Sequence, residues 1–236
     1  MRIDVRPSSA RFVTRTEWLE SRHCFSYGAH YDPGNVGFGT LVAHNDDVLE
    51  PGGGFADHPH RGVEIVTWMV SGALRHSDDH GGGSRIVQPG TVQRLRTGAG
   101  VVHSEVNASD NIARYIQMWL MPDDELPAAY DVAEVSAGEG GFALIASSTA
   151  DAPISLCTKA ALLAGHFRPG DTASLPPAAF VHLYVIDGAV LLGDVPLLAG
   201  DAARVIDCTD LEITVDGDSQ LLVWVMESSV WRPQPH

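Results

Sequence analysis

The stretches His58-Pro59-His60 and His103-Ser104-Glu105 decide how this chain is interpreted. Alternate side chains of a strand point to the same face, so each stretch can present two metal-binding groups at one point. If the two strands lie side by side, three imidazoles and one carboxylate converge. This set suits a borderline divalent ion such as Fe(II), and an octahedral ion with four protein ligands keeps two positions open for substrate or O₂. The spacing therefore indicates a metal site for chemistry.

The segments around these stretches have the pattern of short strands joined by turns. Val63 to Val70 is rich in β-branched and aromatic residues, Val92 to Leu95 is a further strand candidate, and Tyr115 to Met121 is an apolar run. Glycine turns separate these runs, and helical signals are scarce. Thr16 to Arg22 has the capping threonine of a short helix, but we expect it to be part of a docking arm. The pattern predicts antiparallel β-barrels with frequent glycine turns.

Several segments of the first half carry a family likeness. They are Ser26-Tyr27-Gly28, Pro51-Gly52-Gly53-Gly54-Phe55, His58-Pro59-His60-Arg61-Gly62, Gly98-Ala99-Gly100-Val101-Val102-His103-Ser104-Glu105 and Gln117-Met118-Trp119-Leu120. In order and spacing they resemble the pirin family of the cupin superfamily. The likeness extends from about Phe25 to Trp119. It implies an all-β fold of two cupin-type antiparallel β-barrel (jelly-roll) domains in tandem, a bicupin, with few short helices.

The resemblance also implies a set of metal ligands. They would be His58, His60, His103 and Glu105, which are all present. A standard cupin would instead use Glu64, which has the same alternation parity as His58 and His60. We expect Glu105 to be the carboxylate ligand and Glu64 to be a polar neighbour. The expected cofactor is one divalent transition metal ion, Fe(II) first, with Mn, Co, Ni, Cu or Zn as alternatives.

Two kinds of function follow from the same resemblance. Several bacterial pirin-like proteins resemble quercetin 2,3-dioxygenases, which implies a metal-dependent dioxygenase that opens the ring of a flavonol such as quercetin, or of a similar aromatic enol. Glu105 would then also be catalytic, as the acceptor of the proton of the substrate hydroxyl. The alternative, by likeness to the eukaryotic pirins, is a non-catalytic iron-binding regulator that responds to redox state and acts through a protein partner.

The second half of the chain echoes the first. Ile186 to Val190 is similar to Val70 to Leu74, and a repeated plan of this kind predicts a second barrel. The expected divisions are an N-terminal cupin domain with the metal site at 1–125, a connection at 126–141 and a C-terminal cupin domain without metal ligands at 142–236. At the places of the four ligands, counted from the repeated glycine turns, the second half has Ser174, Pro176, Ile213 and Val215.

Other histidines of the first half are not expected to bind the ion. His44 is expected at the surface or beside the site, because the four-ligand set is complete without it. His76 and His80 could bind a second ion together with Asp78 and Asp79, but the adjoining glycine run favours a solvated hairpin tip. The apolar residues expected on the ligand face of their strand, either lining a cavity or packing in the core, are Val66, Trp68 and Val70.

Charge limits the partners. The net charge is −15 and Lys159 is the one lysine, so the chain lacks the basic stripe that a nucleic-acid binder needs. The same acidity disfavours anionic lipid surfaces and the phosphorylated substrates of a sugar isomerase. We expect a small aromatic substrate and O₂ as partners, a regulatory protein partner only in the alternative, and no direct binding of nucleic acid.

Hydrophobicity and cysteine usage indicate the compartment. The content of 44% hydrophobic residues is ample for a buried core. No run approaches the roughly twenty apolar residues of a membrane span, and the start lacks a hydrophobic signal region. Cys24, Cys157 and Cys208 are widely spaced and odd in number, which fits a reducing compartment. We therefore expect a cytoplasmic protein that does not enter a membrane.

Overall fold

A computed structural model describes residues 1–80, 83–124, 126–149 and 151–229 of the chain. These residues form mostly antiparallel strands, and the described part contains a single short helix, the 3₁₀ turn η1 (Ser8–Ala10). The chain divides into two compact units. The first barrel comprises Phe12–Gly37 and Leu41–Val135, and the second barrel comprises Met1–Arg11, Phe38–Thr40 and the chain from Ser136 onward. The all-β expectation is thus confirmed.

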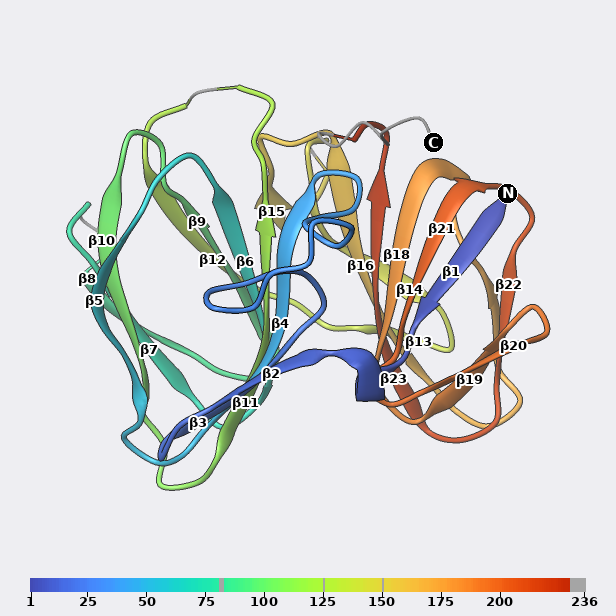
Figure 1. Cartoon of the computed structure of the whole chain (residues 1–236), viewed down its shortest axis with the longest axis horizontal. Coiled ribbons are helices and arrows are strands. Elements are labelled where there is room, and N and C mark those ends of the chain that lie inside the picture. Colours follow the sequence, from blue (N-terminus) through green and yellow to red (C-terminus); the bar gives the residue numbers. More distant parts are fainter. Residues whose placement is uncertain (81–82, 125, 150, 230–236) are drawn as a thin grey trace. The chain divides into compact units, whose positions relative to one another are not determined.

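The first barrel consists of two antiparallel sheets around a common interior (Figure 1). The larger sheet has the order β12 (Ala129–Glu134), β9 (Thr91–Arg96), β6 (Glu64–Ser71), β11 (Ala113–Leu120), β4 (Leu41–Leu49), β3 (Leu19–His23) and β2 (Phe12–Arg15). The smaller sheet has the order β5 (Gly54–His60), β10 (Val101–Asn107), β7 (Leu74–Asp78) and β8 (Gly83–Val87). The two histidine stretches therefore lie on neighbouring strands, with His103 opposite His58.

The second barrel repeats this plan. Its larger sheet has the order β1 (Arg2–Arg6), β21 (Ala202–Cys208), β18 (Ala178–Asp187), β23 (Ser219–Met226), β16 (Ala160–Phe167), β14 (Phe142–Ser147) and β15 (Ile154–Ser155), and β13 (Gly138–Glu139) pairs with β16. Its smaller sheet has the order β17 (Thr172–Ser174), β22 (Glu212–Val215), β19 (Ala189–Leu192) and β20 (Val195–Leu198). The central pairing of β22 with β17 and β19 corresponds to that of β10 with β5 and β7, as the internal echo predicts.

The strands cross the predicted domain limits 1–125, 126–141 and 142–236. At the N-terminus, β1 pairs with β21 of the second barrel, with Arg2 opposite Ile206. Within the predicted connection, β12 pairs with β9 of the first barrel and β13 pairs with β16 of the second. The predicted connection therefore adds a strand to each barrel, and the first residues of the chain belong to the second unit.

The stretch from Thr16 to Arg22 forms no helix. Its second half is part of β3, which pairs with β2 and β4. The odd-numbered residues of β3 are buried and the even-numbered ones are partly exposed, which is the period of a strand. Thr16 does accept a hydrogen bond from the backbone N–H of Leu19 at 3.1 Å, but this contact closes a turn that leads into the strand.

The places that correspond to the expected ligands are filled by hydrocarbon in the second barrel. Ile213 of β22 lies opposite Ala173, as His103 lies opposite His58 in the first barrel. Ala173, Leu175 and Ile213 pack in the apolar core, whereas Ser174 is exposed. The counted position Ser174 was therefore wrong by one residue, and a shift of one residue moves a side chain to the other face of a strand.

The interior of the first barrel is apolar at one end. Leu49, Met69, Leu74, Val87 and Tyr115 form a buried cluster there. A second buried cluster, formed by Ile65, Leu95 and Val101, lies at the other end. Between the two clusters the inward positions of β10 are His103 and Glu105, so the polar side chains lie in the middle of the barrel.

Gly54 lies where β5 passes close to β10. A Cβ at this position would lie 2.5 Å from the Cα of Val106, closer than real Cβ contacts. We expect Gly54→Ala to push β5 away from β10 and to lower the free energy of unfolding by about 1–3 kcal/mol, measured by denaturant unfolding. The control is Gly217→Ala, whose Cβ would meet nothing within 4 Å. Equal stability of the Gly54→Ala variant and wild type would contradict the close packing.

Candidate metal centre

Three histidines converge in the interior of the first barrel, between its two apolar clusters. His58 and His60 come from β5 and His103 comes from β10, and one nitrogen of each lies within 4.8 Å of the others. Their ring centroids are 4.4–4.9 Å apart. The structure thus brings the three predicted histidines together at a spacing that could hold one ion.

A β-bulge aims the side chains of β5. His103 pairs with His58, but Glu105 pairs with Phe55, so β5 has one residue more than β10 over this interval. Such a bulge re-aims the side chains that follow it. Phe55 and His58 both line the interior as a result, although they are three positions apart. Simple alternation along the sequence does not predict this.

His103 is the most deeply buried member of the cluster. It is 1% exposed, and neither ring nitrogen has a hydrogen-bond partner among the described residues. Buried polar atoms left without a partner cost free energy. Burial lowers the pKa of His103 and of His60 to about 4, so both rings are neutral near pH 7. Neutral imidazoles with free lone pairs fit a transition metal ion.

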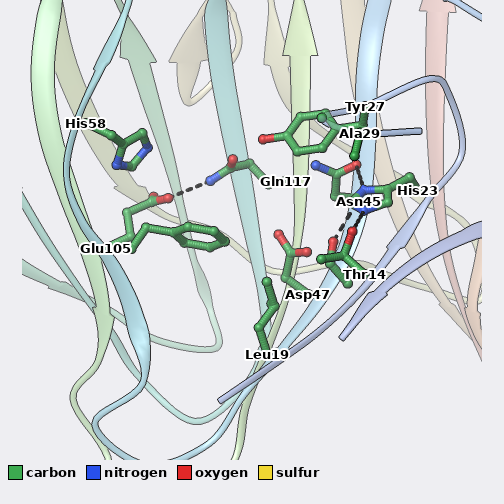
Figure 2. A pocket seen from close by; sticks show the side chains of 13 residues that line it. Thr14, Leu19, His23, Tyr27, Ala29, Asn45, Asp47, His58, Glu105 and Gln117 are labelled. Atoms are coloured by element: carbon green, nitrogen blue, oxygen red, sulfur yellow. Dashed lines mark hydrogen bonds between the residues drawn. The ribbon is translucent and has the colours of Figure 1, made fainter. Parts of the chain in front are cut away.

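Glu105 lies beside this cluster with a fixed carboxylate. Its oxygens accept hydrogen bonds from Gln93 Nε2 at 2.8 Å and from Gln117 Nε2 at 2.7 Å, the second drawn in Figure 2. Burial acts to raise the pKa of Glu105, but its neighbours His76, His103 and Gln117 outweigh this and lower the pKa to about 2. Glu105 groups within 4.8 Å with His103 and His76, and so adjoins the three histidines through His103.

His76 is a site residue that the sequence did not predict. It is fully buried, not at a solvated hairpin tip, and it lies opposite Glu105 on β7. Its ring is 5.2 Å from that of His103 and stacks on Tyr130 at 4.4 Å. In the sequence, the charged Arg75 between Leu74 and His76 was the available signal for the burial of His76. The structure shows this alternation, with Leu74 and His76 buried and Arg75 exposed. The expectation of a solvated tip fits His80, whose side chain is 46% exposed.

A second layer of contacts holds the amides that bind Glu105. Gln93 donates a hydrogen bond to Thr67 Oγ1 at 3.1 Å and accepts one from the Tyr130 hydroxyl at 2.9 Å. Gln117 accepts a hydrogen bond from Trp119 Nε1 at 3.0 Å. Tyr130 comes from β12, within the predicted connection, so nothing in the motif pointed to it.

Thr67 shows which face of β6 points inward. Because Thr67 contacts Gln93, alternation places Val66, Trp68 and Val70 on the opposite face, and their expected position beside the ligands was wrong. Glu64 lies on that opposite face too, buried, with its carboxylate 3.5 Å from Arg94 Nη1. The parity argument failed because Gly62, with φ of +67°, turns the chain between β5 and β6.

His44 is buried on β4, with its Nδ1 3.5 Å from the thiol of Cys24. It was expected at the surface or beside the site. The inward positions of this part of β4 are instead Asn45 and Asp47, which line the pocket. His44 therefore faces away from the cluster. The sequence analysis did not predict that the side chain of His44 is buried.

A cavity of about 220 Å³ adjoins the cluster (Figure 2). Its wall includes His58, Glu105 and Gln117 on the side of the histidine cluster. The other lining residues are Thr14, Leu19, Ser21, His23, Tyr27, Gly28, Ala29, Asn45, Asp47 and Phe55. A small molecule in this cavity would contact both the cluster and the strands β2 to β4.

The fold and the cluster define a class, the tandem pair of cupin-type barrels with a histidine and glutamate cluster in the first one. A sequence family described as Pirin matches residues 5–120, and one described as Quercetinase C-terminal cupin domain matches residues 144–225. The chain belongs to the pirin family. The predicted bicupin fold is thereby confirmed. The first match begins at residue 5, before the expected Phe25, and ends at residue 120, next to Trp119.

Relatives and solved structures agree along nearly the whole chain. A Mycobacterium tuberculosis protein provisionally named quercetin 2,3-dioxygenase is 42% identical over 97% of this chain and 96% of its own. The quercetin 2,3-dioxygenase of Escherichia coli K12 is 29% identical over 94% of this chain and 97% of its own. The bacterial pirin YhhW from Escherichia coli, in complex with nickel(II), superimposes with a TM-score of 0.90 at 29% identity, over 96% of this chain and 100% of that one.

None of the helices in the described part of the chain has both the length and the apolar character needed to cross a membrane.

Asp47 gives the first barrel a pH-dependent stability. Burial raises its pKa from 3.8 to about 7, against the lowering effect of Ser21. The folded protein then keeps a proton that the unfolded chain releases, so this contribution is fully present below about pH 4 and is lost as the pH rises through 7. The stability of Asp47→Asn relative to wild type should increase by roughly 1 kcal/mol per pH unit between pH 5 and 7, measured by urea unfolding of metal-free protein. A pH-independent difference would show that Asp47 is ionised in the folded state.

Proposed function

We propose that this chain is a metal-dependent dioxygenase of the pirin type, which opens the ring of a flavonol such as quercetin or of a similar aromatic enol. The observation that carries the proposal is His103, buried beside two further histidines with both ring nitrogens unpartnered among the described residues, next to a cavity. The names of the relatives support the reaction class. A dioxygenase adds both atoms of O₂ to its substrate, and the chain must therefore bind an electron-rich aromatic compound close to the cluster.

The proposed metal ligands are His58, His60, His103 and Glu105. Three imidazoles and a carboxylate suit a divalent transition metal, and we propose Fe(II) as the native ion, although the related YhhW structure holds nickel(II). A bound ion would supply coordination positions for a substrate oxygen and for O₂ and would accept and return electrons. His58 Nδ1 bonds the carbonyl of Ala56 at 2.8 Å, which leaves its other nitrogen for the ion.

Glu105 is proposed to accept the proton of the substrate hydroxyl. Glu105 is buried beside the cavity, and the amides of Gln93 and Gln117 hold its carboxylate in one orientation. A base is effective only within hydrogen-bond reach of the proton that it takes, so this fixed orientation matters as much as the charge. The apolar lining of the cavity, including Leu19 and Phe55, excludes water from the same region.

Removal of one imidazole should remove the ion. We expect His103→Ala to reduce bound metal from one ion per chain to less than about a tenth of an ion per chain after dialysis. The reason is that a metal site loses most of its affinity for the ion when one of its protein ligands is removed. Elemental analysis measures this, and circular dichroism should show that both barrels remain folded. The control is His166→Ala in the second barrel, whose side chain is 52% exposed. Full metal occupancy in His103→Ala would refute the ligand assignment.

Oxygen uptake tests the reaction itself. Protein reconstituted with Fe(II) should consume O₂ when quercetin is added, and His103→Ala should lower the rate by about a hundredfold or more. The control without flavonol should show no uptake. Absence of uptake by wild-type protein with one iron per chain would contradict the dioxygenase proposal and favour the alternative of a redox-responsive regulator.

A further inference from the structure

The cavity has two chemically different sides. β5 and β10 contribute His58 and Glu105, which the proposed reaction uses. The opposite strands contribute a row of polar side chains that the reaction does not use, here called the polar row: Thr14, Ser21, His23, Asn45 and Asp47. Figure 2 shows Asn45 and Asp47 extending from β4 into the pocket. The polar row therefore faces whatever occupies the cavity.

Most of the polar row is bonded within itself. His23 Nδ1 lies 2.9 Å from Asn45 Oδ1, and His23 Nε2 lies 2.9 Å from Thr14 Oγ1. Because an amide oxygen can only accept, His23 donates from Nδ1 and accepts the Thr14 hydroxyl proton at Nε2. These three side chains satisfy one another and shape the wall.

Asp47 differs from the rest of the row. It is 3% exposed, and the hydroxyls of Ser21 and Tyr115 interact with its carboxylate and act to lower its pKa. Its Oδ1 nevertheless has no donor in hydrogen-bond geometry among the described residues. The neighbouring cation is not available to it, since Arg114 binds both oxygens of Asp46 on the other face of β4, at 3.0 and 2.9 Å. A buried carboxylate that has no counter-charge and one oxygen outside hydrogen-bond geometry destabilises the protein unless a ligand binds that oxygen.

The surroundings of Asp47 indicate the chemistry of its partner. A free carboxyl oxygen is complementary to a hydroxyl donor. Apolar side chains, among them Leu19, Ala29 and Phe55, line the same cavity and suit an aromatic ring. The cavity of about 220 Å³ is smaller than the roughly 300–1,000 Å³ of sites for drug-sized ligands, which favours a flat compound of a few rings.

We propose that Asp47 binds a hydroxyl group at the end of the substrate remote from the reacting hydroxyl, and so selects aromatic substrates that carry hydroxyls at both ends. This inference rests on the proposed function, because it takes the reacting hydroxyl to lie at Glu105. Asp47 is then a specificity-determining residue, and the hydrogen bond that it makes orients the ring across the cavity. The raised pKa of its buried carboxyl agrees with a group that lacks a charged partner in the free protein.

Two flavonols test this in the wild-type protein. 3-Hydroxyflavone carries only the reacting hydroxyl, whereas quercetin has further hydroxyls on both of its terminal ring systems. Binding to metal-loaded protein is measured without O₂ by fluorescence titration. We expect quercetin to bind roughly tenfold or more tightly, the effect of a hydrogen bond to a charged or buried group. Equal affinity for the two compounds would overturn the proposal without need of any variant.

Variants at Asp47 test whether this residue binds the second hydroxyl of the substrate. Asp47→Leu should weaken quercetin binding roughly tenfold and leave 3-hydroxyflavone binding within about twofold. Asp47→Asn keeps an acceptor oxygen and should retain most of the preference. The matched control is Asp46→Asn, on the other face of the same strand, which should keep the wild-type ratio of the two dissociation constants. Equal weakening of both flavonols by Asp47→Leu would indicate a purely structural role and overturn the proposal.

O₂ uptake on the same samples separates the two proposals. If wild type consumes O₂ with quercetin but Asp47→Leu still prefers quercetin to 3-hydroxyflavone, the proposed reaction is supported and the proposed role of Asp47 is wrong. If wild type consumes no O₂ while Asp47→Leu loses the preference for quercetin, the contact with Asp47 is supported and the proposed reaction is wrong. Failure of wild type to bind either flavonol would overturn the assignment of Asp47.

Discussion

The pairing of β10 with β5 on one side and β7 on the other is the constraint on which the site depends. It sets His103 opposite His58 and Glu105 opposite His76. Backbone hydrogen bonds of the two ladders fix these positions, so the imidazoles are held together before any ion binds. The bulge in β5 then turns His58 and Phe55 to the same interior. A shift of one residue in either ladder would turn the cluster to the outside.

The same ladder in the second barrel has a different use. There β22 lies between β17 and β19, but its inward residues, such as Ile213, pack in an apolar core. The fold is therefore stable with hydrocarbon at these positions, and the chemistry of the first barrel is carried by a few side chains on a shared scaffold. In the first barrel the cost of burying them is offset by the amides around Glu105 and by the apolar clusters on either side.

The parts of the fold and the site that could be predicted from the sequence are those whose signals lie within a short stretch of chain. The three histidines form short motifs on neighbouring strands, and their convergence needed only the pairing of those strands, whereas Glu105 adjoins them through His103. His76, Gln93 and Tyr130 come from strands that join the site through register alone, and the period of a single strand cannot reveal register. Glu64 and Ser174 show the limit of counting, since one turn at Gly62 or one extra residue reverses a face. The helix considered for Thr16 to Arg22 does not form, because strand pairing overrides the local capping signal.

The central claim is that His103 and its neighbours hold one divalent ion in the first barrel. The most direct measurement is an anomalous difference map from crystals of the protein grown with nickel(II), the ion of the related YhhW structure. The geometry predicts one strong peak per chain within bonding distance of His58, His60 and His103, with Glu105 as the fourth protein ligand. Absence of a peak there, or a peak bound by other side chains such as those of Asp79 and His80, would contradict the claim.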